Sequence, residues 1–443
     1  MTPRQRLVAE TVIFAFRDGT WEPSRMAARA VHDLGLEPAQ PWIDQLAADA
    51  RAIYDEAPAE TPGDLLRLVV AILVDSTTID PTVRDLLLED PGWHGPLRPP
   101  PTEMGERRWP VEPLSTPAEL ARFLNLDSGT LEWYADVKSL ERSVVEENLR
   151  HYDYRWRRKR RGGARLIEAP KQNLKYFQRR ILRSVLDHVP AHDAAHGFRR
   201  GRSIQSHATP HTGRAVVVRL DLDNFFTAVS AGRVFSIFRA AGYPIEVARL
   251  LVGLTTNATP HAVLVGRPGQ ERTPSDAALR GPHLPQGAPT SPALANLAAF
   301  GLDRRLDALA SRFDARYTRY ADDLAISGGD DFGRAIPQFL ALVGTIVKDE
   351  GFRVNRAKTQ VRGRHQRQVL TGMVVNNHLN VHRNDFDQLR AVLHDASTNG
   401  PAAANRGNHP QFRAHLEGRI GFVQATNPVR ARKLWMMFDR IDW

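Results

Sequence analysis

The sequence predicts an α+β protein in which a helical extension comes before a mixed body and helices close the chain. In residues 1–90, apolar residues recur at intervals of three and four, the spacing of amphipathic helices. Tyr152, Tyr154 and Trp156 alternate with polar residues instead, which is typical of a strand. From residue 385 onward the helical spacing returns. The strands are therefore expected in the middle of the chain.

Composition excludes several classes of protein. At roughly 150 residues per domain, 443 residues suggest two to four domains, and 42% hydrophobic with 25% charged residues is ordinary for a globular chain. The absence of cysteine excludes disulfides, thiolate metal sites and cysteine nucleophiles, and it fits a reducing cytoplasm. The longest nearly apolar stretch, Leu65 to Val74, is shorter than the ~20 residues that span a bilayer. We expect a cytoplasmic protein with no membrane partner.

The net charge of +10 is unevenly distributed along the chain. Residues 1–100 hold 9 Arg, no Lys and 16 Asp plus Glu, a net charge of −7. Residues 151–220 hold 17 Lys plus Arg against 4 Asp plus Glu, a net charge of +13. A basic block predicts a polyanionic partner such as nucleic acid, although a solvated basic face is the alternative. The acidic start predicts a different role, such as docking a protein.

Prolines and a helix-capping residue divide the chain into segments. Prolines gather between the helical start and the mixed body, as in a stiff linker. Thr116 is a predicted N-cap with Pro117 at the first helical position, so a new helix begins there. The predicted domains are an acidic helical extension (1–95), a Pro-rich linker (96–114), the mixed body (115–380) and a helical C-terminal domain (381–443).

The body contains strands at defined places. The aromatic strand at 152–156 and the segment 165–170 flank a Gly-Gly turn and form a predicted hairpin. A helix is predicted over 174–189, and a short buried strand over 216–220 ends at Asp221. A second predicted hairpin joins Arg316–Tyr320 to Leu324–Ser327.

Three carboxylates stand out in these strands. Asp221 closes the buried strand, and Asp322 and Asp323 occupy the tip of the second hairpin. Adjacent carboxylates repel each other unless a cation lies between them. Oxygen ligands suit Mg²⁺ or Mn²⁺, and two such ions can stabilise both sides of a phosphoryl transfer. Taken alone, an Asp-Asp pair is ordinary turn chemistry, and Asp221 could be a simple strand-end cap.

Two further segments favour nucleotide chemistry. The rigid loop from Leu284 to Pro292 carries Gln286 and Gly287, which can offer a polar, closely approaching surface to a base and sugar. Lys358 follows in a turn that comes before another strand. Each feature has an ordinary alternative, since Pro/Gly loops and solvated lysines are common.

Taken in order, these blocks resemble the signature motifs of reverse transcriptases. The resemblance covers roughly residues 115–443 and implies a right-hand polymerase, with fingers and palm in 115–380 and a thumb in 381–443. The motifs that carry it are the basic hairpin, His196-Gly-Phe-Arg-Arg-Gly-Arg-Ser203, Asp221-Leu-Asp-Asn-Phe-Phe226, Leu284 to Pro292, Tyr320-Ala-Asp-Asp323 and Gly351 to Thr359.

Two segments resemble retron reverse transcriptases in particular. Asn257-Ala-Thr-Pro-His261 is similar to their Asn-Ala-x-x-His segment. Val369-Leu-Thr-Gly-Met-Val-Val-Asn376 is similar to their Val-Thr-Gly segment, from which Leu370 departs. The alternatives are another bacterial reverse transcriptase, such as an abortive-infection type that polymerises without a template, and a catalytically silent RNA-binding scaffold. The intact aspartates argue against a silent protein.

The resemblance implies roles for individual residues. Asp221, Asp322 and Asp323, with the carbonyl of Leu222, would hold two Mg²⁺ ions, or Mn²⁺. Lys358 would neutralise or protonate the leaving pyrophosphate. Phe226 would pack under the sugar C2′ and exclude ribonucleotides, with core packing as its alternative. The residues implied to bind dNTPs or RNA are Arg165 and Lys171 for the triphosphate, Gln286 for the nucleotide or template, Asn257 and His261 for the cognate RNA, and Arg157, Arg158, Arg199 and Arg200 for phosphates.

The resemblance also implies a biological activity. The enzyme would use dNTPs to copy a structured noncoding RNA, priming from an RNA 2′-hydroxyl and leaving an RNA–DNA hybrid. The product would be branched multicopy single-stranded DNA. Related systems imply antiphage defence with an effector protein, which the extension could dock.

Overall fold

The computed structural model describes residues 2–37, 40–58, 63–75, 77, 79–89, 103–144, 146–158, 163–266 and 274–443. Helices and strands alternate in the described body, which confirms the α+β class. The chain divides into two compact units, Met1–Pro190 with Val229–Leu294, and Ala191–Ala228 with Ala295–Trp443. Residues 96–102 of the predicted linker lie outside the described residues. The domain boundaries derived from sequence remain predictions.

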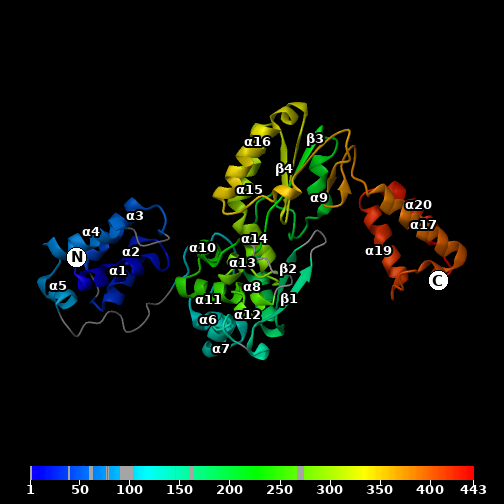
Figure 1. The fold of residues 1–443 in the computed structure, drawn as a ribbon. Helices are drawn as coiled ribbons and strands as arrows, with labels where there is room; N and C mark the ends of the chain where they lie inside the picture. The colour runs from blue at the N-terminus through cyan, green and yellow to red at the C-terminus, as the bar shows by residue number, and fades with distance from the viewer. Residues whose placement is uncertain are drawn as a thin grey trace. The chain divides into compact units, whose positions relative to one another are not determined.

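The helical extension has its own hydrophobic core. Val8, Val12 and Phe16 on the first helix are fully buried, as their helical spacing predicts. Proline occupies an N-terminal helical position in four of the five helices, where it costs no hydrogen bond. The helices, shown in blue in Figure 1, are α1 (Pro3–Arg17), α2 (Pro23–Leu34), α3 (Pro41–Ile53), α4 (Gly63–Asp75) and α5 (Pro81–Leu88).

The rest of the first unit contains the basic hairpin. Its strands β1 (Tyr152–Arg158) and β2 (Ala164–Pro170) pair antiparallel, which confirms the prediction. Residues 159–162, in the predicted turn, lie outside the described residues. Other elements are α6 (Pro117–Leu124), capped by Thr116 as predicted, α7 (Ser128–Tyr134), η1 (Glu147–Leu149), α8 (Gln172–Ser184), η2 (Leu186–His188), α10 (Ala231–Ala240), α11 (Ile245–Thr255), α12 (His261–Val265) and α13 (Pro274–Arg280).

Helix α8 ends earlier than its sequence spacing predicts. The spacing indicates a helix to residue 189, but the α-helix stops at Ser184 and a 3₁₀ turn follows. The carbonyl of Ser184 accepts a hydrogen bond from the backbone N–H of Glu112, a donor outside the helix. A carbonyl bonded in this way no longer needs a partner in a further helical turn.

A four-stranded antiparallel sheet forms the centre of the second unit. The strand order is β4-β5-β3-β6, and in the register of the central pair Asp221 lies opposite Asp323. Helices α15 (Phe300–Arg312) and α16 (Asp330–Asp349) pack against it, as Figure 1 shows. The strands are β3 (Val216–Asp221), β4 (Arg316–Tyr320), β5 (Asp323–Gly328) and β6 (Gln360–Gly363). The helices that come before one or other of these strands in the chain are α9 (Ile204–Ala208), η3 (Thr209–His211), α14 (Ser291–Ala298) and η4 (Arg356–Lys358).

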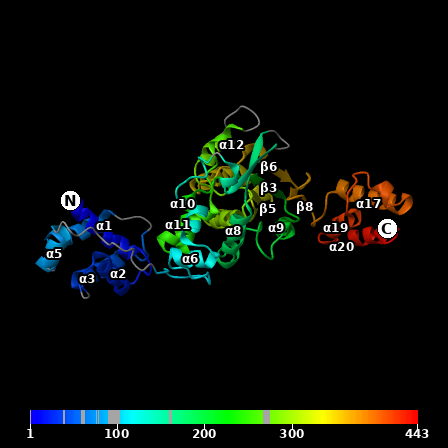
Figure 2. The same cartoon turned by 90° about the horizontal axis from the view of Figure 1, so that it is seen from below.

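The C-terminal helices form a separate core, which confirms the helical prediction after residue 385. Leu389, Leu393, Leu416, Ile420 and Leu434 are buried in it. Figure 2 shows α17, α19 and α20 side by side. The elements are β7 (Val369–Leu370), β8 (Met373–Val374), α17 (Arg383–Asn399), α18 (Pro401–Ala404), α19 (Phe412–Gln424) and α20 (Pro428–Phe438). Across the described residues, no helix is both long and apolar enough to cross a membrane.

Candidate active site

The sheet brings the three predicted carboxylates together. The antiparallel register places Asp221, the last residue of β3, opposite Asp323, the first residue of β5. The neighbouring Leu222 donates its backbone N–H to the carbonyl of Asp322 at 2.9 Å, which ties the two chain segments together. Ala321 has a φ of 56°, so the turn contains a left-handed residue and reverses tightly. The arrangement gathers three acids at one end of a rigid sheet.

Basic side chains hold two of the three acids. The ammonium of Lys358 lies 2.9 and 2.8 Å from the two carboxylate oxygens of Asp221, which is buried. The Nη2 atom of Arg219 lies 2.7 and 2.8 Å from the two oxygens of Asp323. The sequence analysis singled out Lys358 but missed Arg219. The one sign of Arg219 in the sequence is a charged residue within an otherwise apolar strand.

The pKa of the third acid, Asp322, shows that the carboxylates lie close together. Burial raises the pKa of Asp322, and the nearby charges of Asp221 and Asp323 raise it further, while Lys358 acts in the opposite direction. Like charges that raise the pKa of a neighbouring carboxyl in this way lie close to it. A bound cation would relieve this repulsion.

The donor chemistry matches the predicted metals. Three carboxylates provide only oxygen ligands, which Mg²⁺ and Mn²⁺ prefer. Leu222, whose carbonyl was predicted as a further ligand, lies beside Asp221 and is buried. Within the described residues, no group of three or more acids and histidines is arranged so that it could hold a metal ion as it stands. Asp221 and Asp323 are instead paired with Lys358 and Arg219. The donors therefore fit the metals by type.

A buried ion pair supports the turn from behind. Arg319 and Asp303 are both fully buried, and the guanidinium makes two bonds of 2.7 and 2.6 Å to the carboxylate. The same guanidinium donates to the carbonyl of Ala321 at 3.0 Å and to Asn296 at 2.9 Å. Sequence reasoning missed both members of the pair. We infer that Arg319 fixes the turn that carries Asp322 and Asp323.

The His-Gly-Phe segment needs a glycine at position 197 for a physical reason. A Cβ at this position would lie 2.6 Å from the backbone nitrogen of Ala321, so any larger residue would push against the turn. The carbonyl of Gly197 also accepts a hydrogen bond of 2.9 Å from Asn296. The loop before α9 therefore approaches the acidic turn closely.

The two adjacent phenylalanines have different surroundings. Phe225 is buried, stacks on Phe352 with 5.6 Å between ring centroids, and lies under the guanidinium of Arg319. Phe226 is only half-buried and neighbours the exposed ring of Phe198. Phe225 therefore fills the core, and Phe226 keeps part of its ring accessible.

The predicted dNTP-binding residues other than Phe226 belong to the first unit, and their environments differ. Arg165 is exposed on β2, opposite Arg157. Lys171 donates its ammonium to the backbone carbonyls of η1, including that of Asn148 at 3.3 Å. Gln286 is half-buried, and its backbone carbonyl accepts the N–H of β2 residue Glu168 at 3.0 Å. Arg165 is thus the more accessible of the two predicted triphosphate contacts.

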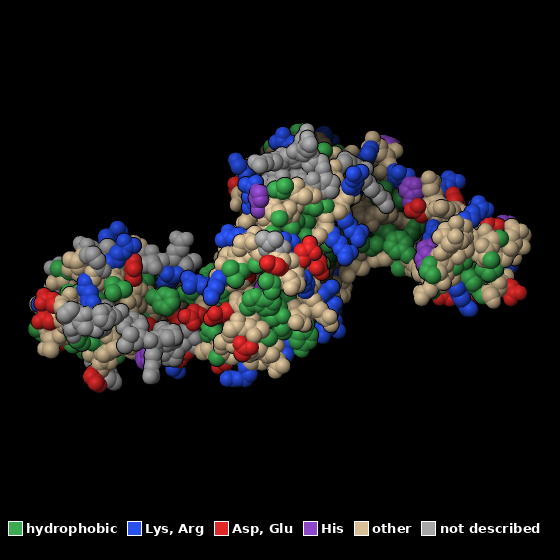
Figure 3. Space-filling model, turned by 60° about the horizontal axis from the view of Figure 1, so that its bottom comes forward, with side chains coloured by type: hydrophobic (Ala, Val, Ile, Leu, Met, Phe, Trp, Pro, Cys, Tyr) green, Lys and Arg blue, Asp and Glu red, His purple; other side chains and the backbone are tan. Residues whose placement is uncertain are grey.

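Most of the predicted RNA-binding arginines lie at the surface. Arg157, Arg158 and Arg200 are exposed, and Lys and Arg side chains are seen in blue on the face drawn in Figure 3. Arg199 is different, because its guanidinium donates to the backbone carbonyls of His192 and Ala195 at 2.8 and 3.1 Å. Arg199 therefore shapes its own loop.

The two ends of the Asn-Ala-Thr-Pro-His segment have opposite environments. His261 is exposed at the start of α12. Asn257 is only 5% exposed, and its side-chain amide donates to the carboxylate of Glu168 at 2.8 Å. The sequence resemblance assigned both residues to RNA, but the structure places only His261 where it can be reached from solvent.

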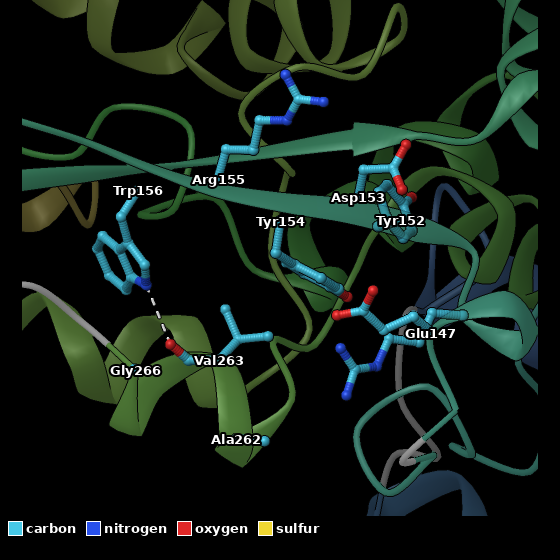
Figure 4. A pocket seen from close by; sticks show the side chains of 10 residues that line it. Glu147, Tyr152, Asp153, Tyr154, Arg155, Trp156, Ala262, Val263 and Gly266 are labelled. Carbon is cyan, nitrogen blue, oxygen red and sulfur yellow. Dashed lines mark hydrogen bonds between the residues drawn. The ribbon is translucent and has the colours of Figure 1, made fainter.

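A pocket of about 550 Å³ lies between β1 and α12. Figure 4 shows Tyr154 and Trp156 on one side of β1, with Asp153 and Arg155 on the other. The indole N–H of Trp156 donates to the carbonyl of Val263 at 3.0 Å, which joins the hairpin to α12. Trp156 therefore packs between the hairpin and α12.

Comparisons with known proteins identify the family of this chain. A family model described as reverse transcriptase (RNA-dependent DNA polymerase) matches residues 157–374. Retron Mx65 reverse transcriptase of Myxococcus xanthus is 36% identical and aligns over 88% of this chain and 85% of its own. Retron Mx162 reverse transcriptase of the same organism is 35% identical over 74% and 67% of the two chains. Retron Ec86 reverse transcriptase of Escherichia coli is 31% identical over 63% and 77%.

A solved structure gives a more distant match. The foamy viral protease-reverse transcriptase in complex with double-stranded DNA aligns with a TM-score of 0.36 and 14% identity. The alignment covers 67% of this chain and 40% of that one.

Proposed function

Because this chain belongs to the retron reverse transcriptases, we propose that it copies a structured noncoding RNA into branched, multicopy single-stranded DNA. The first dNTP would join an RNA 2′-hydroxyl, and each later one would join the 3′-hydroxyl of the growing strand, releasing pyrophosphate. The observation that supports catalysis most directly is the gathering of Asp221, Asp322 and Asp323 at the end of one sheet. An intact acidic trio argues against a silent scaffold.

Reverse transcriptases typically use divalent metals. In this chain Asp221, Asp322 and Asp323, with the carbonyl of Leu222, would hold two Mg²⁺ ions, or Mn²⁺ in their place. When bound, such ions neutralise charge that develops on the transferred phosphoryl group. Lys358, whose ammonium contacts Asp221, would neutralise or protonate pyrophosphate as it leaves.

The hairpin and the Pro-Gln-Gly loop would bind the incoming nucleotide. The exposed guanidinium of Arg165 would contact the triphosphate, with Lys171 supporting this region through the carbonyls of η1. Gln286 would contact the nucleotide or the template base. These side chains position the reactants, which supplies much of the catalysis in phosphoryl transfer.

Recognition of the RNA would combine charge and shape. Arg157, Arg158 and Arg200 would contact phosphates, and His261 would contribute to binding the cognate fold. The acidic extension has its own core and would dock an effector protein in antiphage defence. Its net charge of −7 over residues 1–100 makes it a poor surface for RNA.

The test of this function is the product made in cells. Cells that express the chain with its native flanking DNA should accumulate one short single-stranded DNA, joined to RNA until a debranching enzyme cleaves a 2′–5′ linkage. His261→Ala should reduce this product more than it reduces copying of a generic primed RNA. Val265→Ala, an exposed change on the same helix, is the control. Untemplated or heterogeneous DNA would instead favour an abortive-infection type of enzyme.

Phe226 gives a prediction about sugar selection. Phe226→Ala should raise the use of ribonucleotides relative to dNTPs roughly tenfold, because removing the ring makes room for a 2′-hydroxyl. Steady-state incorporation of each nucleotide on the same primed template measures the ratio. Phe225→Leu is the matched control, since it changes the buried neighbour and should lower stability without altering the ratio. An unchanged ratio in folded Phe226→Ala would assign that ring to packing alone.

A further inference from the structure

A buried carboxylate outside the acidic trio holds three chain segments together. Glu168 on β2 is completely inaccessible to solvent. Its carboxylate accepts hydrogen bonds from the amide of Asn257 and the hydroxyl of Thr259, each at 2.8 Å, and its other oxygen lies 2.8 Å from Nε2 of His283. A buried charge with this many partners is costly to assemble, and phosphoryl transfer as described above makes no direct use of it.

The partner atoms of His283 define where its protons lie. Its Nδ1 atom faces the carbonyl of Gly281 at 2.8 Å, and a carbonyl can only accept, so Nδ1 carries a hydrogen. The Nε2 atom faces a carboxylate oxygen, so a second proton is shared between His283 and Glu168. Burial lowers the pKa of His283, but the hydrogen bond to Glu168 and the charge of that carboxylate raise it above its usual value.

The backbone around Glu168 is equally constrained. Its N–H donates to the carbonyl of Gln286 at 3.0 Å. Gly287 has a φ of 141°, and a Cβ there would lie 2.8 Å from the carbonyl of Glu168, so the Pro-Gln-Gly loop sits directly against β2. Asn257 and His283 exchange backbone hydrogen bonds of 2.9 and 3.0 Å. Hairpin, loop and Asn-Ala-Thr-Pro-His segment therefore meet at one side chain.

A second buried acid continues the network to β1. The amide of Asn257 donates to the hydroxyl of Tyr154 at 3.1 Å, and this hydroxyl donates to Glu141 at 2.7 Å. Figure 4 shows the Tyr154 side chain on the same side of β1 as Trp156. Both strands of the hairpin are thus tied to Asn257.

We propose that Glu168 is a positioning residue for DNA synthesis, which sets the place of Gln286 relative to the nucleotide-binding hairpin. Asn257 then acts through Glu168 instead of by touching RNA. The proposal rests on the proposed function, in which Gln286 contacts the nucleotide or template. On this proposal Asn257, the first residue of the Asn-Ala-Thr-Pro-His segment, contributes to the polymerase reaction and does not bind RNA.

Glutamine is the conservative replacement for Glu168, because it can keep the hydrogen bonds of the carboxylate. Glu168→Gln keeps an oxygen for Asn257 and Thr259, and its amide N–H can donate to an unprotonated Nε2 of His283. His283 still donates from Nδ1 to Gly281, so every group keeps a partner. Glu168→Ala instead leaves three buried groups without their acceptor.

The experiment measures KM for dNTPs and kcat separately on a generic primed RNA with the full chain. Glu168→Ala should raise KM roughly tenfold with little change in kcat, and Glu168→Gln should restore wild-type KM. Gln286→Ala should raise KM similarly, and the double variant should add little to it. Glu132→Ala, at an exposed glutamate, should change neither parameter. Circular dichroism and RNA binding confirm that each variant is folded.

A pH profile provides an independent measurement that does not need the alanine variant to fold. As pH rises through the raised pKa of His283, the imidazole keeps only one N–H, so either the Glu168 carboxylate or the Gly281 carbonyl loses its donor. The KM of the wild type should therefore rise at alkaline pH, whereas that of Glu168→Gln should stay flat. The other titratable groups packed here are Tyr152, Tyr154 and Glu141, and burial raises the pKa of both tyrosines, so they stay protonated.

The outcomes separate this proposal from the proposed function. The positioning role would be overturned if the wild type and Glu168→Gln had parallel pH profiles, or if folded Glu168→Ala had an unchanged KM. The proposed function would still be supported by DNA synthesis in the wild type. A normal KM in Gln286→Ala would instead remove Gln286 from nucleotide binding, and with it the proposed route from Glu168. Equal losses in kcat and RNA affinity would make Glu168 merely structural.

Discussion

Asp322→Asn is expected to lower dNTP incorporation by about a thousandfold or more while RNA binding stays close to that of the wild type. Removing one acidic ligand weakens charge neutralisation at the transferred phosphoryl group, an effect of several kcal/mol. The variant keeps the size of the side chain and leaves the exposed arginines unchanged. Primer extension measures incorporation, and an electrophoretic mobility shift with the cognate RNA measures binding.

Asp223→Asn is the matched control for this loss. Asp223 follows Asp221 by two residues and interacts with Arg353 at 3.6 Å, outside the acidic trio. Its variant should retain most of the activity. Substantial synthesis by Asp322→Asn on a defined template would refute the metal-ligand assignment. An inactive Asp223→Asn would favour Asp223 over Asp221 as a metal ligand.

The acidic trio was predictable because its signals are local. A buried strand that ends in Asp221 and a hairpin with Asp322 and Asp323 at its tip are visible in short stretches of sequence. Antiparallel pairing of the two strands then brings the acids together. The helical extension and the C-terminal helices were predictable for the same reason, since their periodicity needs no distant partner.

The environment of Asn257 was not predictable in this way. A motif reveals that a residue belongs to a segment, but not whether its side chain points into the protein or toward RNA. Its partner Glu168 is 89 residues away in sequence, and a lone glutamate in a basic hairpin gives no sign of complete burial. The environments of Lys171 and Arg199 were not predictable either. Their cationic groups donate to backbone carbonyls, and no sequence pattern predicts those partners.

The buried pair behind the acidic turn provides the second large effect. Arg319→Met should lower the free energy of unfolding by about 3–5 kcal/mol, because Asp303 is left as an unpaired charge with no access to solvent. Polymerase activity should fall with it, since the carbonyl of Ala321 loses its donor. Chemical denaturation and primer extension, both on the full chain, measure the two losses.

The double variant Arg319→Met with Asp303→Leu separates stability from positioning. Replacing both charges by apolar side chains removes the unpaired carboxylate, so part of the lost stability should return. The rest stays lost, because the buried hydroxyl of Tyr317 no longer has Asp303 as its acceptor. Activity should stay low, because no donor then fixes Ala321 and the turn that carries Asp322 and Asp323. If activity recovers together with stability, the ion pair serves only the core, and the turn keeps its geometry through the approach of Gly197 and the pairing of β4 with β5.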